Sequence, residues 1–290
     1  MALNASELIL NADQSIYHLN LLPQDLAHTI ITVGDPDRVK EVSDHFDTIE
    51  LKKGKREFIT HTGTRNGKRI SVISTGIGTD NIDIVLNELD ALANIDFSSR
   101  TIKAKHTQLD IIRIGTSGAI QSDIPIDSFL LSEYAVGLDG LLHYYSNSDI
   151  QHRDFQEAFV QHTNWATEKS TPYVVSYDSK LAKMIISNRI RLGVTITSTG
   201  FYGPQGRQLR LVAKHNEFLS NLQTFQHSHL QITNLEMETS GIYALSKLLG
   251  HRAISLNAIL ANRITGAFSR TPKKTVDELI QYTLERLTGG

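Results

Sequence analysis

The sequence predicts a single α/β domain built on a mixed β-sheet, and three observations support this fold class. Short β-branched segments that end in glycine alternate with longer segments of helical apolar spacing. The 290 residues suffice for one large buried core. No repeat, linker or low-complexity stretch divides the chain. Residues 1–290 are therefore expected to form one domain, with an insertion around residues 145–173, where the periodicity is weak.

The individual elements are predicted from this periodicity. Strands are expected at 28–33, 69–74, 110–114, 128–134, 192–198 and 253–261. Helices are expected at 82–92, 180–188, 236–249 and 273–287, the last of them followed by two glycines. The first three strands run into the glycine-containing segments GDPDR, TGIGTDN and GTSG.

Composition excludes several classes of function. A formal net charge of -2 gives no global field of the kind that holds nucleic acid or an anionic membrane. The absence of cysteine excludes a disulfide framework, a thiolate nucleophile and a cysteine metal site. No signal peptide and no apolar run of about 20 residues is found, so a soluble cytoplasmic protein is expected.

Three strand ends combine glycine with a cation or a hydroxyl group. Gly34 and Arg38 follow the first strand, the glycines of TGIG follow the second, and Arg113 and Thr116 belong to the third. Ligands of open α/β sheets gather at these ends, where glycine admits an anion to the backbone and arginine matches phosphate oxygens. Arg113 lies inside an apolar strand and needs an anionic partner. Taken singly, each glycine could be a turn and each arginine a solvated charge.

A second set of polar candidate residues lies in the C-terminal half of the chain. Gln205 and Arg207 suit uracil, because the amide can serve one carbonyl and the ring N–H while the guanidinium donates to the other carbonyl. An exposed polar loop is the alternative. Glu236 and Glu238 belong to the same polar set, but each could simply compensate a helix dipole. TGIGTDN lacks the third glycine of a dinucleotide fingerprint, and no phosphate-binding loop of nucleotide triphosphatases is present.

Taken together, the motifs resemble those of uridine phosphorylases, in the nucleoside phosphorylase family. They occur in the family's order from about Tyr17 to the last helix, outside 145–173: YHLNLLPQDL, VGDPDRV, KREF, STGIG, NELDAL, IRIGTSGAIQ, FYGPQGR, LEMET and ANR. The resemblance implies a three-layer α/β/α fold and the phosphate-dependent, reversible cleavage of uridine or a related pyrimidine nucleoside. It also implies inorganic phosphate as co-substrate, no organic cofactor, and a homodimer as the minimal active unit, usually built up into a hexamer.

The resemblance assigns roles residue by residue. The phosphate residues are Gly34, Arg38, Arg113 and Thr116, with Arg56 from a neighbouring subunit. The ribose residues are Met237 and Glu238, with His18 reaching the 5′-hydroxyl across a dimer interface. The residues for the base and its developing charge are Phe201, Gln205, Arg207 and, less directly, Arg263.

Two loops depart from the family pattern. Bacterial uridine phosphorylases tend to have GGPS where this chain has GTDN at residues 78–81. In some relatives that loop and Glu57 form a K+ site at the dimer interface, and the departure leaves K+ open here. The GPQGR loop has glycine where glutamate is common, but the spacing of Gln205 and Arg207 survives, so the base preference is expected to be retained.

Four alternatives stay open. A purine nucleoside phosphorylase would usually place an aspartate near Asn262, where ANR has none. A nucleoside hydrolase would not need Arg38, Arg56 and Arg113 together. No motif excludes a catalytically silent nucleoside-binding protein, and a general sugar-phosphate or NAD enzyme is the least favoured.

Overall fold

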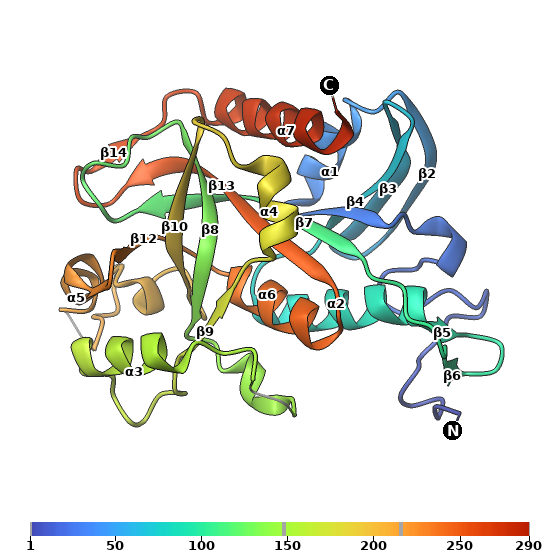
Figure 1. Cartoon of the computed structure of the whole chain (residues 1–290), viewed down its shortest axis with the longest axis horizontal. Helices are drawn as coiled ribbons and strands as arrows, with labels where there is room; N and C mark the ends of the chain where they lie inside the picture. The colour runs from blue at the N-terminus through green and yellow to red at the C-terminus, as the bar shows by residue number, and fades with distance from the viewer. Residues whose placement is uncertain (1, 147–148, 215–216, 290) are drawn as a thin grey trace.

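The computed structural model describes residues 2–146, 149–214 and 217–289, and its elements alternate around one large sheet (Figure 1). The strands of that sheet are β1 Thr29–Val33, β2 Thr48–Lys55, β3 Phe58–Arg65, β4 Lys68–Ser74, β7 Asp110–Ala119, β8 Ser128–Gly137, β9 Tyr173–Ser176, β10 Ile190–Thr197, β11 Gln226–His227, β12 Leu230–Glu236, β13 Arg252–Asn262 and β14 Ala267–Phe268. A separate hairpin pairs β5 Ile95–Asp96 with β6 Thr101–Ile102. The α-helices are α1 Pro36–Ser43, α2 Thr79–Asn94, α3 Arg153–His162, α4 Ser179–Ile185, α5 Phe218–Thr224, α6 Thr239–Leu248 and α7 Pro272–Thr288. Short 3-10 helices are η1 Pro23–Asp25, η2 Leu141–Tyr144 and η3 Gly203–Gln205.

The sheet is mixed, and part of it closes on itself. Its strand order is β11-β12-β10-β8-β13-β7-β1-β4-β3-β2. β7 pairs in parallel with β1 and β13, whereas β8 runs antiparallel to β13. The last residues of β7 also pair with β12, where Gly118 lies opposite Leu235. This closure brings the carboxyl ends of β7 and β12 together.

Helices cover both faces of the sheet, as alternation along the strands requires. Ile30 and Ile111 pack with α2 and α6, and the next residues, Ile31 and Ile112, pack with α1, α4 and α7 on the other face. All four isoleucines are fully buried, as expected for parallel strands covered on both sides. Figure 1 shows α1 and α7 on one side of the sheet and α2 and α6 on the other. The predicted three-layer α/β/α fold is confirmed.

The start of α1 and the end of α7 carry expected capping signals. Asp35 caps α1 by accepting a hydrogen bond from Asp37 N at 3.0 Å, and Pro36 takes the first helical position. α7 ends at Thr288 and is capped by Gly289, whose φ of 70° is left-handed. In the part of the chain that the structure describes, no helix has both the length and the apolarity needed to span a membrane.

Several predicted boundaries are wrong; for example, β8 continues to Gly137 and α2 begins at Thr79. β7 continues to Ala119, so the GTSG segment lies within the strand, where pairing with both β13 and β12 holds it extended. Glu236 ends β12, and α6 begins only at Thr239. α4 ends at Ile185, short of the predicted residue 188.

Strands β2, β3, β9 and β12 were not predicted, because their side chains are largely polar or their runs are short. In β3, Thr60 and Thr62 are fully buried. The Thr62 hydroxyl group pairs with Ser71 Oγ at 2.7 Å, which satisfies both groups inside the protein.

The expected insertion contains α3. Its Phe155 and Phe159 are buried in a cluster with Val136 of β8 and Val194 of β10. Residues 147 and 148 of this region lie outside the described residues.

Candidate active site

A cavity of about 730 Å³ opens at the carboxyl ends of β1, β4, β7 and β12, and we call it the central cavity. Nine of the twelve residues that the sequence assigns to a site line it. They are Gly34, Arg38, Arg113, Thr116, Phe201, Gln205, Arg207, Met237 and Glu238. His18, Arg56 and Arg263 do not line it.

Arg113 is buried on β7 and is held by carboxylates of this same chain. Its Nη2 lies 2.7 Å from Glu238 Oε2 and 3.1 Å from Glu236 Oε2. Its Nη1 donates to Asn257 Oδ1 at 3.0 Å. Burial alone would lower the pKa of Arg113, but Glu236 and Glu238 raise it above the ordinary value. The anionic partner that the sequence requires is therefore supplied within the chain.

Gly115 allows this arrangement of Arg113. Residues two apart share one face of a strand, so the side chain of Arg113 lies over Gly115. A Cβ atom at Gly115 would lie 2.1 Å from Arg113 Nη1, inside contact distance. The first glycine of GTSG therefore makes room for a guanidinium group.

The guanidinium group of Arg38, unlike that of Arg113, is not paired closely with carboxylates. It lies in the first turn of α1, and its buried Nε has no hydrogen-bond partner among the described residues. The nearest carboxylate oxygen, Glu41 Oε2, is 3.9 Å away. Burial lowers the pKa of Arg38. An unsatisfied buried donor at a cavity wall fits an anionic acceptor, because such groups are costly without a partner.

The two glutamates after β12 have different roles. Glu236 accepts hydrogen bonds from the backbone N–H groups of Glu238 and Thr239, both at 2.9 Å, so it does compensate the start of α6. Glu238 accepts from Gly78 N at 2.8 Å and from Arg113. Burial raises the pKa of Glu238 and Arg113 opposes that shift.

The loop at 199–207, after β10, supplies the predicted base residues. Arg207 stacks 3.9 Å from the Phe201 ring centroid and donates to the Phe201 carbonyl at 2.8 Å and to Gln205 Oε1. Gln205 is almost fully buried. Burial, with the nearby charge of Arg263, lowers the pKa of Arg207 to about 10. Arg263 donates to the Gln205 carbonyl, so it supports the loop from behind.

His18 and Arg56 lie outside the central cavity, on segments that contact each other. The His18 ring packs edge-on against Phe58, with ring centroids 6.3 Å apart, and Lys55 Nζ donates to the Tyr17 carbonyl at 2.6 Å. Arg56 lies in the tight turn between β2 and β3 with a φ of 56°, which is unusual for a residue with a side chain.

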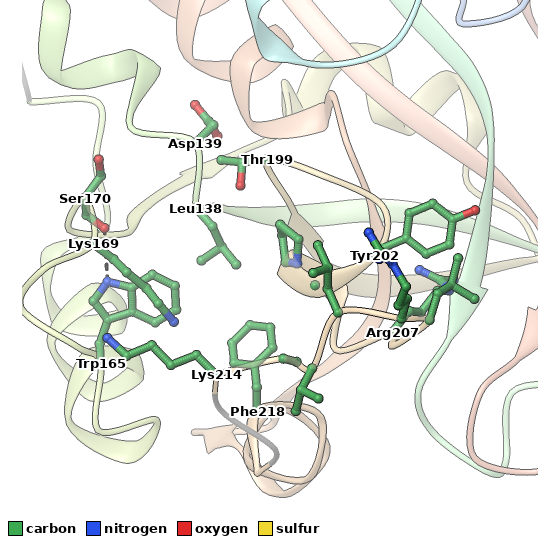
Figure 2. A pocket seen from close by; sticks show the side chains of 17 residues that line it. Leu138, Asp139, Trp165, Lys169, Ser170, Thr199, Tyr202, Arg207, Lys214 and Phe218 are labelled. Carbon is green, nitrogen blue, oxygen red and sulfur yellow. Dashed lines mark hydrogen bonds between the residues drawn. The ribbon is translucent and has the colours of Figure 1, made fainter.

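A second, larger cavity of about 900 Å³ lies beside the 199–207 loop, and we call it the side cavity. Figure 2 shows Arg207 and Tyr202 on one side of it and Trp165 with Lys169 on the other. Arg207 lines both cavities. Asp139, also in the side cavity, accepts hydrogen bonds from Tyr173 Oη at 2.8 Å and Ser240 Oγ at 2.9 Å. The sequence does not reveal this cavity because its walls come from distant loops.

Some supporting residues of the central cavity also escape prediction from the sequence. Asn257 holds Arg113, and Thr197 Oγ1 donates to Glu236 Oε1 at 2.6 Å. Their only signal in the sequence is a polar side chain inside an apolar strand.

The side-chain amide of Asn262 is hydrogen-bonded to the backbone. Its Nδ2 donates to the carbonyls of Gln121 and Ile124, at 2.8 and 2.9 Å. Its Oδ1 accepts from the N–H groups of Ile264 and Thr265, at 3.0 and 3.1 Å. It does not line the central cavity, so it serves the turn after β13.

The chain is similar in sequence to known nucleoside phosphorylases. The family model described as Phosphorylase superfamily matches residues 28–287. The uridine phosphorylase of Thermococcus kodakarensis is 31% identical, over 89% of this chain and 81% of the relative. That of Haemophilus influenzae is also 31% identical, over 86% of each chain. A purine nucleoside phosphorylase of Colwellia psychrerythraea is 25% identical, over 92% of this chain and 97% of the relative.

Solved structures give the same result for the fold. A Trypanosoma brucei nucleoside phosphorylase, described as showing uridine phosphorylase activity, superposes with a TM-score of 0.87 at 28% identity, covering 98% of this chain and all of the other. A structure from work on two uridine phosphorylases of Phytophthora capsici superposes with a TM-score of 0.70 at 21% identity, covering 100% of this chain and 99% of the other. The chain therefore belongs to the phosphorylase superfamily.

Proposed function

We propose that this protein is a pentosyltransferase that cleaves uridine with inorganic phosphate, giving uracil and ribose 1-phosphate. One observation carries the proposal: a single cavity is lined by Arg38, by Glu238 and by the pair Gln205 and Arg207. An anion site, a ribose acceptor and a pair of uracil donors thus share one space. The reaction is reversible, so uracil salvage and uridine breakdown both fit it.

The chemistry follows from the charges in the cavity. A phosphate oxygen held by Arg38 forms a bond to C1′ as the C1′–N bond breaks through an oxocarbenium-like state. The bonding electron pair leaves with the uracil ring, whose carbonyl oxygens gain negative charge. Gln205 and Arg207 donate hydrogen bonds where this charge develops, which is preorganised electrostatic stabilisation. Glu238 accepts hydrogen bonds from the ribose hydroxyl groups. The ring takes up a proton afterwards.

Two observations favour uracil over a purine. Both polar atoms of the Asn262 amide are hydrogen-bonded to backbone groups, so Asn262 provides no acid that could protonate a purine nitrogen. The two uridine phosphorylases are 31% identical to the chain, whereas the purine enzyme is 25% identical.

We infer that the active unit is a dimer in which His18 and Arg56 of one subunit complete the central cavity of the other. Both residues lie outside the cavity of their own chain, and they lie on neighbouring segments. A single partner surface could therefore receive both. Assembly of such dimers into a hexamer is a further prediction of the family resemblance.

No step of this proposal passes through K+. Asn81 directs its amide nitrogen toward Glu57 Oε1 at 3.4 Å, and it fills the space above Gly76. A cation needs oxygen ligands, and a nitrogen donor facing the carboxylate does not fit that need.

Assays with uridine, deoxyuridine, thymidine and inosine, each with and without phosphate, test the proposal. We expect uracil release from uridine only when phosphate is present. Release without phosphate would indicate a hydrolase, and cleavage of inosine alone would indicate a purine enzyme. Binding of uridine with no turnover would indicate a catalytically silent protein.

A further inference from the structure

Glu88, in the middle of α2, binds the N-terminal segment that carries His18. Its Oε1 and Oε2 each accept from His18 N at 3.1 Å, and Oε2 also accepts from Leu19 N at 2.9 Å. Its Oε1 lies 2.6 Å from His18 Nδ1. The carboxylate side chain is 13% exposed, so water screens these contacts weakly. One side chain therefore fixes both the backbone and the ring of His18.

The carboxylate also decides which ring nitrogen of His18 carries the proton. An ionised carboxylate can only accept, so a neutral imidazole must place its N–H on Nδ1. Nε2 is then left with a lone pair. Within the described part of the chain, the ring of His18 makes its hydrogen bond through Nδ1 alone, so the lone pair on Nε2 is free for a ligand.

We propose that Glu88 is a positioning residue that makes His18 a hydrogen-bond acceptor for the 5′-hydroxyl group of the nucleoside. This inference rests on the proposed function. An oriented Nε2 lone pair selects a ligand that presents an O–H donor at the 5′ position. A 5′-deoxynucleoside has no such donor and gains nothing from Glu88.

The tautomer can be measured without any turnover. In ¹⁵N-histidine-labelled protein, at an alkaline pH that keeps the ring neutral, the signals of His18, assigned with His18→Ala, should show a protonated Nδ1 and an unprotonated Nε2. Glu88→Gln should shift His18 toward a mixture of tautomers, because an amide can donate as well as accept. An Nε2–H tautomer or a doubly protonated ring in the wild-type protein would overturn the proposal.

Kinetics then test the consequence for the substrate. Glu88→Gln should raise KM for uridine about tenfold, the size of one net hydrogen bond, with little change in kcat. KM for 5′-deoxyuridine should stay unchanged, and Glu88→Gln added to His18→Ala should have no further effect. Glu278→Gln, which alters an exposed helix carboxylate, is the matched control.

An equal rise in KM for both nucleosides would mean that Glu88 acts only on the fold, and it would refute the inference. Failure of the wild-type protein to cleave uridine with phosphate would instead refute the proposed function. The tautomer experiment keeps these two failures distinct.

Discussion

At the scale of single residues, two arginines that line the central cavity, Arg113 and Arg38, have different surroundings. Arg113 is bound to two carboxylates, and one guanidinium with two ionised glutamates leaves a net negative charge. Among the described residues, the nearest carboxylate to Arg38 is that of Glu41, 3.9 Å away, and Arg38 Nε has no hydrogen bond. In the proposed function, Arg38 and Arg56 of the neighbouring subunit therefore attract the phosphate, and Arg113 chiefly holds Glu238 in place.

Gly115→Ala tests the position of the Arg113 guanidinium group. The new Cβ would overlap Nη1, so the guanidinium must move and release Glu238. We expect kcat/KM for uridine to fall by about tenfold or more, the effect of losing a hydrogen bond to a charged group. Steady-state kinetics with a crystal structure of the variant would check this, and an unmoved Arg113 would contradict it.

Arg207→Ala tests the stabilisation of the leaving base. We expect kcat to fall about 10²-fold or more, by analogy with the loss of one oxyanion donor. Thermal unfolding should change little, since Arg207 belongs to a loop that is only partly buried. Arg210→Ala, an exposed arginine in the same segment, serves as control and should keep its activity. Near-normal phosphorolysis by Arg207→Ala would refute the assignment.

At the scale of elements, Asp139 joins three of them. It follows β8, and its carboxyl group accepts from Tyr173 of β9 and Ser240 of α6. The backbone N–H of Ser240 donates to Thr197 Oγ1 at 2.9 Å, and Thr197 Oγ1 in turn donates to Glu236. A chain of hydrogen bonds thus links the side cavity to a carboxylate that holds Arg113.

The pH dependence of stability should reveal this buried carboxyl group. Burial raises the pKa of Asp139 above its ordinary 3.8, so the folded protein holds the proton more tightly than the unfolded chain. The free energy of unfolding then falls as pH rises from 3.8 through the folded pKa, with a limiting slope of about 1.4 kcal/mol for each pH unit. Asp139→Asn has no carboxyl group at this position and should not show this fall. Denaturant titrations across this pH range should therefore show the free energy of unfolding of Asp139→Asn increasing relative to that of the wild type as pH rises. A difference between the two proteins that does not change with pH would count against a desolvated carboxyl group.

At the scale of the whole molecule, the proposed dimer makes a direct prediction. Arg38→Ala removes an arginine from the cavity of its own chain, whereas Arg56→Ala removes the arginine that the chain contributes to the cavity of its partner. Each variant alone should be nearly inactive. Co-expression of the two should restore about a quarter of wild-type activity, because half of randomly formed two-fold dimers hold one intact site. Activity no greater than the sum of the two variants would show that each chain completes its own site.

The family, the three-layer fold and nine of the residues that line the central cavity can be predicted from the sequence alone. This is possible because buried strands appear in the sequence as β-branched runs, and because glycine and arginine recur at several strand ends within motifs that follow the order of a known family. The confirmed strands and α7 show the first point, and Gly34, Arg38 and Arg113 show the second.

The partner that each charge meets depends instead on the folded chain. Arg113 pairs with glutamates more than 120 residues away, because β12 closes onto the end of β7. The polar strand β3 was missed because its buried Thr62 hydroxyl group is satisfied by Ser71 on the neighbouring strand, and no local sequence pattern predicts such a pair. The hydrogen bonds of Glu88 to His18 join residues 70 apart and have the same origin. Local periodicity specifies elements, whereas hydrogen bonds between distant segments are set only when the chain has folded.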